Sequence, residues 1–153
     1  MEVPERGQSI KRHEALKPLS RHHMSALHLA LKLRRIGTDE SDQTPEQLRK
    51  EVASFWIPDG QAHFREEQEI LLTTFAKHAD IQRPEIQDML IEHVQIWALM
   101  DQITATENID LNMMHELGVL LDGHVRKEER IIFPMIEQAL PESILQEMAP
   151  YLA

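Results

Sequence analysis

The sequence contains no cysteine, and this absence removes several kinds of site at once. Without thiolates, the chain itself supplies no disulfide, no zinc–thiolate site, no iron–sulfur ligand and no thiol redox chemistry. Glycine and aromatic residues are also scarce, at 5 glycines and 5% aromatics, whereas leucine, isoleucine, methionine, glutamate and glutamine are frequent. This balance favours helices over strands.

Positive charge is the second shortage. Lysine and arginine number 16 against 26 acidic residues, which gives a net charge of −10. No basic patch stands out, so we expect no nucleic-acid partner. No apolar run reaches the length of a membrane span, and the opening residues, Met1-Glu-Val-Pro-Glu-Arg6, do not have the composition of a signal peptide. We therefore expect a soluble, cytoplasmic protein without a membrane partner.

The hydrophobic content of 42% over 153 residues is enough to bury one core, so we expect a single domain over 1–153 with a short flexible start at 1–8. Apolar residues recur with helical spacing. This spacing predicts helices over about 9–36, 45–77, 84–106 and 108–139, followed by a short terminal helix after Pro141. Long helices joined by short loops are typical of an all-α, up-down-up-down four-helix bundle.

Local signals mark the ends and breaks of these helices. Gly37 is a suitable C-cap, and Thr44, which precedes a proline, has the features of an N-cap. The segment 58–60, Pro-Asp-Gly, interrupts the second helix, so we expect a kink or break just before His63. Pro134 lies inside the fourth helix and should bend or shorten it.

A short phrase occurs twice. The first copy is His63-Phe-Arg-Glu-Glu67-Gln-Glu-Ile-Leu-Leu72, and the second is His124-Val-Arg-Lys-Glu128-Glu-Arg-Ile-Ile-Phe133. Each copy places a glutamate four residues after a histidine, which puts both side chains on one helix face. Composition alone produces some pairs of this kind by chance. The shared flanking residues make the repeat more informative than either pair alone.

The first and third helices show a weaker correspondence. When His23 is aligned with His93, apolar residues align with apolar residues on both sides. The aligned residues of the first helix are Leu16, Leu19, Ala26, Leu29, Ala30 and Leu33. In the same order, those of the third helix are Ile86, Met89, Ile96, Leu99, Met100 and Ile103. Each helix can then offer one inward histidine at a similar depth. His22 is the alternative to His23, which fits the apolar pattern better.

Together these residues would bring histidines and glutamates to one centre with approximate twofold symmetry. A pair of irons needs such a set, because imidazole nitrogen suits ferrous iron and carboxylates bridge two metals. Buried carboxylates without a nearby positive charge would be costly. A mixed iron–manganese pair or another divalent metal such as zinc is compatible with the same ligands.

Ordinary structural roles are the competing interpretations. The His–Glu pairs could be surface pairs on helices, and His93 could be a hydrogen-bonded core histidine. Glu66 and Glu129 are expected to face solvent or to orient ligands, and whether Glu129 joins the site stays open. Trp97 is a core aromatic or a wall of the site. The histidines without a fitting pattern are interpreted as surface or supporting residues: His13, His28, His78 and His115.

In these residues the chain resembles a hemerythrin-like (HHE cation-binding) domain over nearly its whole length. The segments that carry the resemblance are Leu19-Ser-Arg-His-His23, His63-Phe-Arg-Glu-Glu67, Glu92-His93, His124-Val-Arg-Lys-Glu-Glu129 and Ile132-Phe-Pro134. The resemblance implies a four-helix bundle around a non-haem di-iron centre. It also implies bridging carboxylates and one histidine from each helix, which gives the ligand set His23, His63, Glu67, His93, His124 and Glu128.

Two departures from the oxygen-carrying hemerythrins bear on function. Those proteins have a further histidine one turn after the third-helix histidine, where this chain has Trp97. They also have an aspartate five residues after the fourth-helix histidine, where this chain has Glu129. The resemblance therefore implies an open coordination position for a small ligand such as O2, NO or peroxide.

The order of the ligands also resembles that of bacterial di-iron proteins linked to iron–sulfur-cluster repair, which carry a cysteine-bearing N-terminal segment that this sequence lacks. Binding or sensing of O2, NO or peroxide, or iron handling, is the first hypothesis. A di-iron redox enzyme for peroxide reduction or NO-linked iron–sulfur repair, which receives electrons from a redox partner, is the second. A metal-free bundle acting through protein interactions is the third. A homo-oligomer is compatible with the sequence. We find no nucleophile constellation or phosphate loop, so a hydrolase or kinase is not expected.

Overall fold

The structure, a computed structural model, describes residues 11–152, and every regular element within that range is helical. The expected flexible start at 1–8 and the expected first residues of the opening helix, 9–10, lie outside this range. The elements are η1 (Glu14–Leu16), α1 (Lys17–Arg35), α2 (Pro45–Phe55), η2 (Trp56–Gly60), α3 (Gln61–Glu66), η3 (Glu67–Leu72), α4 (Thr73–Ala76), α5 (Pro84–Ala105), α6 (Leu111–Lys127), η4 (Glu128–Ile132), α7 (Phe133–Ala139), α8 (Glu142–Met148) and η5 (Ala149–Tyr151). The elements from α2 to α4 follow one another without a gap, as do those from α6 to α7, and both runs contain π-helical turns.

The helix ends on both sides of the first loop are confirmed. Thr44 caps α2: its hydroxyl oxygen accepts from the Gln47 backbone N–H at 3.1 Å, and the Gln47 side chain accepts from the Thr44 N–H at 2.9 Å. This reciprocal capping box satisfies two donors that a helix start leaves free. Gly37, which follows α1, has a φ of 79°, a conformation that glycine adopts without strain.

The break before His63 is also confirmed. Ile57 has φ −111° and ψ 118°, which are not helical values, inside the π-helical turn η2. The chain then resumes a regular helix at α3, and this restart sets the direction from which His63 enters the interior.

The opening helix begins later than the sequence predicts. His13 lies before the helix, and its Nδ1 accepts the Ala15 N–H at 3.0 Å, so that this side chain caps the turn η1. Arg12 reaches across to Glu137 and to the backbone oxygen of Glu129. Residues 11–13 are not helical, and these tertiary contacts of Arg12 and His13 are not contained in the local periodicity.

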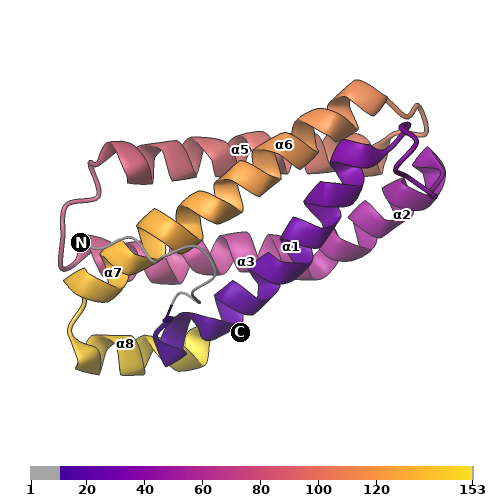
Figure 1. The fold of residues 1–153 in the computed structure, drawn as a ribbon. Coiled ribbons are helices and arrows are strands. Elements are labelled where there is room, and N and C mark those ends of the chain that lie inside the picture. The colour runs from indigo at the N-terminus through magenta and orange to yellow at the C-terminus, as the bar shows by residue number, and fades with distance from the viewer. Residues whose placement is uncertain (1–10, 153) are drawn as a thin grey trace.

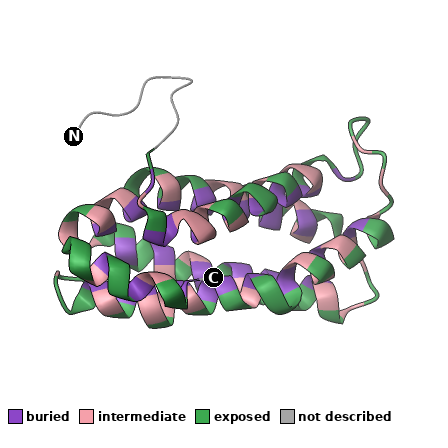
Figure 2. Ribbon diagram, turned by 90° about the horizontal axis from the view of Figure 1, so that it is seen from below, coloured by how far each residue is buried: buried purple, intermediate pink, exposed green. Residues whose placement is uncertain are grey.

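The long helices pack side by side (Figure 1). α1 lies along α6, α6 packs against α5, α5 packs against α2, and α2 packs against α1. Buried residues face inward and exposed residues face outward along each of them (Figure 2). In the part of the chain that is described, no helix is both long and apolar enough to cross a membrane.

The core consists of two apolar clusters. One gathers residues near the α1–α2 loop, such as Leu33, Val52 and Trp56, and the other gathers residues near α7 and α8, such as Leu19 and Phe133. Each long helical run contributes to both clusters and carries polar residues between its two contributions. The interior therefore has a polar layer between two apolar layers.

Candidate metal centre

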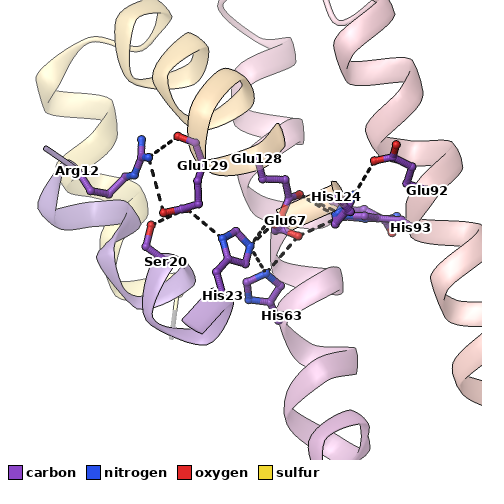
Figure 3. Close-up of polar contacts among 11 residues, drawn as sticks. Arg12, Ser20, His23, His63, Glu67, Glu92, His93, His124, Glu128 and Glu129 are labelled. Carbon is purple, nitrogen blue, oxygen red and sulfur yellow. Dashed lines mark hydrogen bonds and ion pairs between the residues drawn. The ribbon is translucent and has the colours of Figure 1, made fainter. Parts of the chain in front are cut away.

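Six buried polar residues form this layer (Figure 3). They are His23 on α1, His63 on α3, Glu67 at the start of η3, His93 on α5, His124 on α6 and Glu128 at the start of η4. His63 is the most exposed of them, at 5%, and Glu67 is fully buried. Ionisable side chains are rarely buried this completely unless they are paired or bind a metal.

The six residues form two overlapping groups of potential metal ligands. The first contains His23, His63, Glu67 and Glu128, and the second contains Glu67, His93, His124 and Glu128. Within each group the ligand atoms all lie within 4.8 Å of one another. Ligand atoms that surround one first-row metal at about 2.0–2.2 Å lie roughly 3–4.3 Å apart, so each group has about the size of one metal site. Both groups share the two carboxylates, which places those carboxylates where they could bridge two metals.

The nitrogens and oxygens of these groups converge, and several of them have no hydrogen-bond partner among the described residues. His93 Nε2 lies 3.2 Å from Glu67 Oε1, and His124 Nε2 lies 3.2 Å from Glu128 Oε2. In the described part of the chain, however, neither oxygen of Glu67 has a hydrogen-bond partner, and His124 Nε2 has none. Buried polar atoms are normally hydrogen-bonded. Close nitrogens and oxygens that are not aligned for hydrogen bonding fit a cation as their common partner.

Both buried carboxylates are held in the ionised form. Burial opposes ionisation of Glu128, but its contacts with His124, His23 and His93 outweigh burial and hold its pKa well below the usual range. For Glu67, burial and the charge of Glu128 act to raise the pKa, and contacts with His63 and His93 lower it by more. The site therefore has two negative charges at neutral pH.

The histidines supply the balancing protons. Burial lowers the pKa of His23, but Glu128 and Glu129 outweigh it and raise the pKa to about 9. The pKa of His124 is raised to about 10, because Glu128 and Glu92 outweigh its burial. Glu128 and Glu67 raise the pKa of His93 in the same way against its burial. A divalent cation would compete with these protons for the same lone pairs.

Outer contacts orient three of the four histidines. Glu129 Oε2 lies 3.0 Å from His23 Nδ1, and it also accepts the Ser20 hydroxyl at 2.8 Å. Glu92 Oε1 lies 2.9 Å from His124 Nδ1, and the Gln68 amide lies 3.2 Å from His93 Nδ1. Partners of this kind fix the tautomer and the orientation of a ligating imidazole, with the other nitrogen directed to the metal.

A π-helical turn begins at each of the two glutamates. Glu67 is the first residue of η3, and Glu128 is the first residue of η4. In such turns the backbone hydrogen bonds span one more residue than in an α-helix, and they occur frequently at functional sites. Both copies of the repeated phrase therefore share a backbone irregularity as well as residues, and this irregularity was not predicted from the sequence.

His23, rather than His22, lies among the potential ligands. His22 is half-buried, and its ring stacks on that of His63 with centroids 5.4 Å apart. A cavity of about 200 Å³ adjoins this pair, and its lining consists of His22, His23, Ser25, Ala26, Phe55, Asp59, Gly60 and His63. Burial and the neighbouring His63 lower the pKa of His22, despite the acidic side chains nearby.

The other residues with open interpretations lie outside the two groups. His13 binds Glu142 at the surface, and His115 donates to the Ile36 carbonyl at 2.7 Å. His28 and His78 are exposed. Trp97 packs edge-on against Trp56, with centroids 4.8 Å apart, on the side of the first apolar cluster.

Several residues that support the site were not predicted to do so. The ring of Phe64 stacks on His93 at 4.3 Å, and that of Phe133 stacks on His23 at 5.3 Å. Arg12, Gln68 and Glu92 were also missed. Gln68 had a detectable signal, because it occupies the same place in the first copy of the phrase as Glu129 does in the second.

Comparison with known proteins agrees with this geometry. The family model described as the hemerythrin HHE cation binding domain matches residues 14–136, which include all six residues of the polar layer. No curated protein and no solved structure gave a match. Because the family match spans most of the sequence, the chain belongs to the hemerythrin HHE cation binding domain family.

Proposed function

We propose that the protein binds a pair of non-haem irons and uses an open coordination position to bind or sense O2, NO or peroxide, or to hold iron. The observation that carries the proposal is the pair of buried ligand groups that share Glu67 and Glu128. A single structural histidine or a surface ion pair would not need two buried carboxylates with unsatisfied oxygens.

In this proposal His23 and His63 would hold one metal, His93 and His124 would hold the other, and Glu67 and Glu128 would be shared by both. Bound iron would supply one-electron redox chemistry and affinity for small ligands. The protein orients three of the four imidazoles through their outer contacts and excludes bulk water with the apolar clusters on both sides. Trp97 occupies the position at which the oxygen carriers have a further histidine, so this position supplies no additional ligand.

We also propose that residues 1–153 form one domain with the up-down-up-down order of a four-helix bundle. In support, successive long helices connect the two apolar clusters in alternating directions: the run of α1 leads from Leu19 to Leu33, and the run of α2 to α4 leads from Val52 to Phe75. The cytoplasmic location and a possible homo-oligomer stay predictions from the sequence.

The test is metal analysis of protein purified from iron-supplied cells, with absorption spectra recorded in air and after reduction. We expect two irons per chain and near-ultraviolet bands that bleach on reduction. Substitution of both His63 and His124 by alanine should abolish both signals, whereas alanine at the exposed His28 and His78 should preserve them. One metal or none in the unaltered protein, without these bands, would contradict the proposal.

The cavity beside His63 favours one second candidate, a di-iron redox enzyme that reduces peroxide or takes part in NO-linked iron–sulfur repair. A reacting molecule needs access to the metals, and the cavity lies next to two of the proposed ligands, His23 and His63. Such an enzyme needs an electron donor as a redox partner. Sustained turnover of peroxide or NO with added reductant would favour the enzyme, and stoichiometric binding without turnover would favour the sensor or carrier.

A further inference from the structure

The two halves of the site repeat each other closely, and this repeat gives each residue a counterpart. The burial pattern of residues 21–30 is the same, position by position, as that of residues 91–100. His23 therefore corresponds to His93, and each residue on α1 corresponds to the residue 70 positions later on α5. His63 corresponds to His124, 61 positions later, with matching burial at both histidines and both glutamates of the repeated phrase.

The symmetry holds for the partners of His23 and His93. Glu129 contacts Nδ1 of His23 at 3.0 Å, and Gln68 contacts Nδ1 of His93 at 3.2 Å. Gln68 and Glu129 are counterparts, because each directly follows the buried glutamate of its copy. Both histidines are thus oriented from the same place in the fold, one by an amide and one by a carboxylate.

The symmetry fails for the partners of His63 and His124. Glu92 contacts Nδ1 of His124 at 2.9 Å (Figure 3). The Lys127 ammonium donates to the other oxygen of Glu92. The counterpart of Glu92 is His22, which stacks on the ring of His63 instead of accepting a hydrogen bond. Nδ1 of His63 is buried and has no hydrogen-bond partner among residues 11–152.

The half with the unsupported histidine is also the more open one. His63 and His23 are 5% and 3% exposed, against 1% each for His93 and His124. The cavity of about 200 Å³ is lined by His22, His23 and His63, and by neither His93 nor His124. Loss of a partner that orients a ligating imidazole typically lowers metal affinity about 10–100-fold.

We propose that the two metal positions are unequal: the position of His93 and His124 fills first and binds tightly, and the position of His23 and His63 fills second and releases its metal first. This inference rests on the proposed function. Both positions share the same two carboxylates and each has one histidine supported by a carboxylate, so the difference is concentrated at His63 and its neighbour His22. The residue at position 22 is therefore a positioning residue that sets the affinity of the exchangeable metal.

The first test is an anaerobic titration of the metal-free protein with Fe(II) in competition with a chelator. We expect two binding steps whose dissociation constants differ by about tenfold or more. His63→Ala should retain one step with the tighter constant, and His124→Ala should retain one step with the weaker constant. Equal steps, or the tighter constant in His124→Ala, would overturn the inference while leaving the proposed function intact. The absence of both steps in the unaltered protein would instead contradict the proposed function.

The second test restores the missing partner. His22→Glu gives His63 the carboxylate that His124 has in Glu92, and it should tighten the second step about tenfold without changing the first. His28→Glu is the matched control, because it makes the same chemical change at an exposed position of the same helix, α1. The converse variant, Glu92→Gln, should weaken the first step about tenfold, whereas Glu116→Gln on the exposed face of α6 should not.

Circular dichroism of each metal-free variant separates affinity from folding. If the helix content is unchanged and His22→Glu moves the second step no more than His28→Glu does, the role assigned to position 22 is wrong. An equal weakening of both steps in Glu92→Gln would likewise contradict the assignment of the tight position to His124.

Discussion

His23 and Glu128 connect α1 to the start of η4, with His23 Nε2 2.8 Å from Glu128 Oε1. Both side chains are buried, at 3% and 1% exposure. Glu128 also approaches His93 and His124, so a single carboxylate contacts histidines from α1, α5 and α6. Glu128 therefore links three helices through their histidines, and its charge raises the pKa values of those histidines.

The first prediction concerns that carboxylate. Glu128→Gln should reduce bound iron from two per chain to less than one, because Glu128 belongs to both ligand groups and an amide is a much weaker ligand than a carboxylate. Iron content after purification and desalting measures the effect. Glu116→Gln, at an exposed position of α6, is the matched control and should keep its iron. Full iron occupancy in Glu128→Gln would exclude a bridging role for this residue.

The second prediction is that the metal-free protein loses stability as the pH rises above neutrality. The pKa of His23 is about 9 and that of His124 is about 10 in the folded protein, against about 6.5 in an unfolded chain. Their protons stabilise the fold fully below pH 6.5, and this stabilisation disappears as the pH rises through the folded-state values. The difference between the folded and unfolded pKa values of His23 alone corresponds to about 3 kcal/mol in the free energy of unfolding.

Thermal unfolding of chelator-treated protein between pH 3 and pH 10 tests this prediction. The melting temperature should fall between about pH 7 and pH 10. It should also fall on the acid side as the pH drops below about 4.5, because the pKa values of Glu67 and Glu128 are lowered in the folded protein. Glu128→Gln should flatten the alkaline decline, since it removes a main cause of the raised histidine pKa values. A melting temperature that is constant or rises from pH 7 to pH 10 would contradict the assignment.

The third prediction couples metal binding to those protons. At pH 7 the raised pKa values of His23 and His124 keep protons on nitrogens that a metal needs, so metal binding should release protons. Calorimetric titration with Fe(II) in buffers of different ionisation enthalpy measures that release. The iron affinity should increase from pH 6 to pH 8. Proton release that stays near zero over this range would show that the histidines are already neutral before the metal binds.

The sequence predicted the helices and the convergence of the site residues because both follow from short-range patterns. Apolar spacing located the long helices, and Pro58 and Gly60 marked the break before His63. The repeated phrase, together with the alignment of His23 and His93, identified every residue of the polar layer. These features depend on residues that are close in the sequence or that recur in the same order.

The supporting contacts were not predictable in the same way because they join distant residues. Arg12 contacts Glu129 and Glu137, which are 117 and 125 residues away. Glu92 meets His124 from another helix, 32 residues away. Whether two such side chains meet depends on the rotation of each helix about its own axis. The periodicity of apolar residues defines that rotation only approximately. The π-helical turns at Glu67 and Glu128 also escape prediction, because the residues around them have ordinary helix propensities.

The fourth prediction concerns the close packing of α1 on α6. A Cβ atom added at Gly118 would lie 2.9 Å from the backbone oxygen of Ala30 and 2.9 Å from Leu33 Cβ. Both contacts are shorter than van der Waals separation, and a backbone carbonyl inside a helix cannot move freely. Gly118→Ala should therefore force α1 and α6 apart and lower the free energy of unfolding by about 1–3 kcal/mol.

Gly123→Ala on the same helix is the matched control for this prediction. A Cβ atom at Gly123 meets nothing within 4 Å, so alanine should be neutral there or should stabilise the helix by up to about 1 kcal/mol. Denaturant unfolding of both metal-free variants gives the comparison directly. Because α1 carries His23 and α6 carries His124, Gly118→Ala should also weaken iron binding, whereas Gly123→Ala should not. Equal stabilities of the two variants would show that α1 and α6 lie farther apart in solution than the close approach at Gly118 requires.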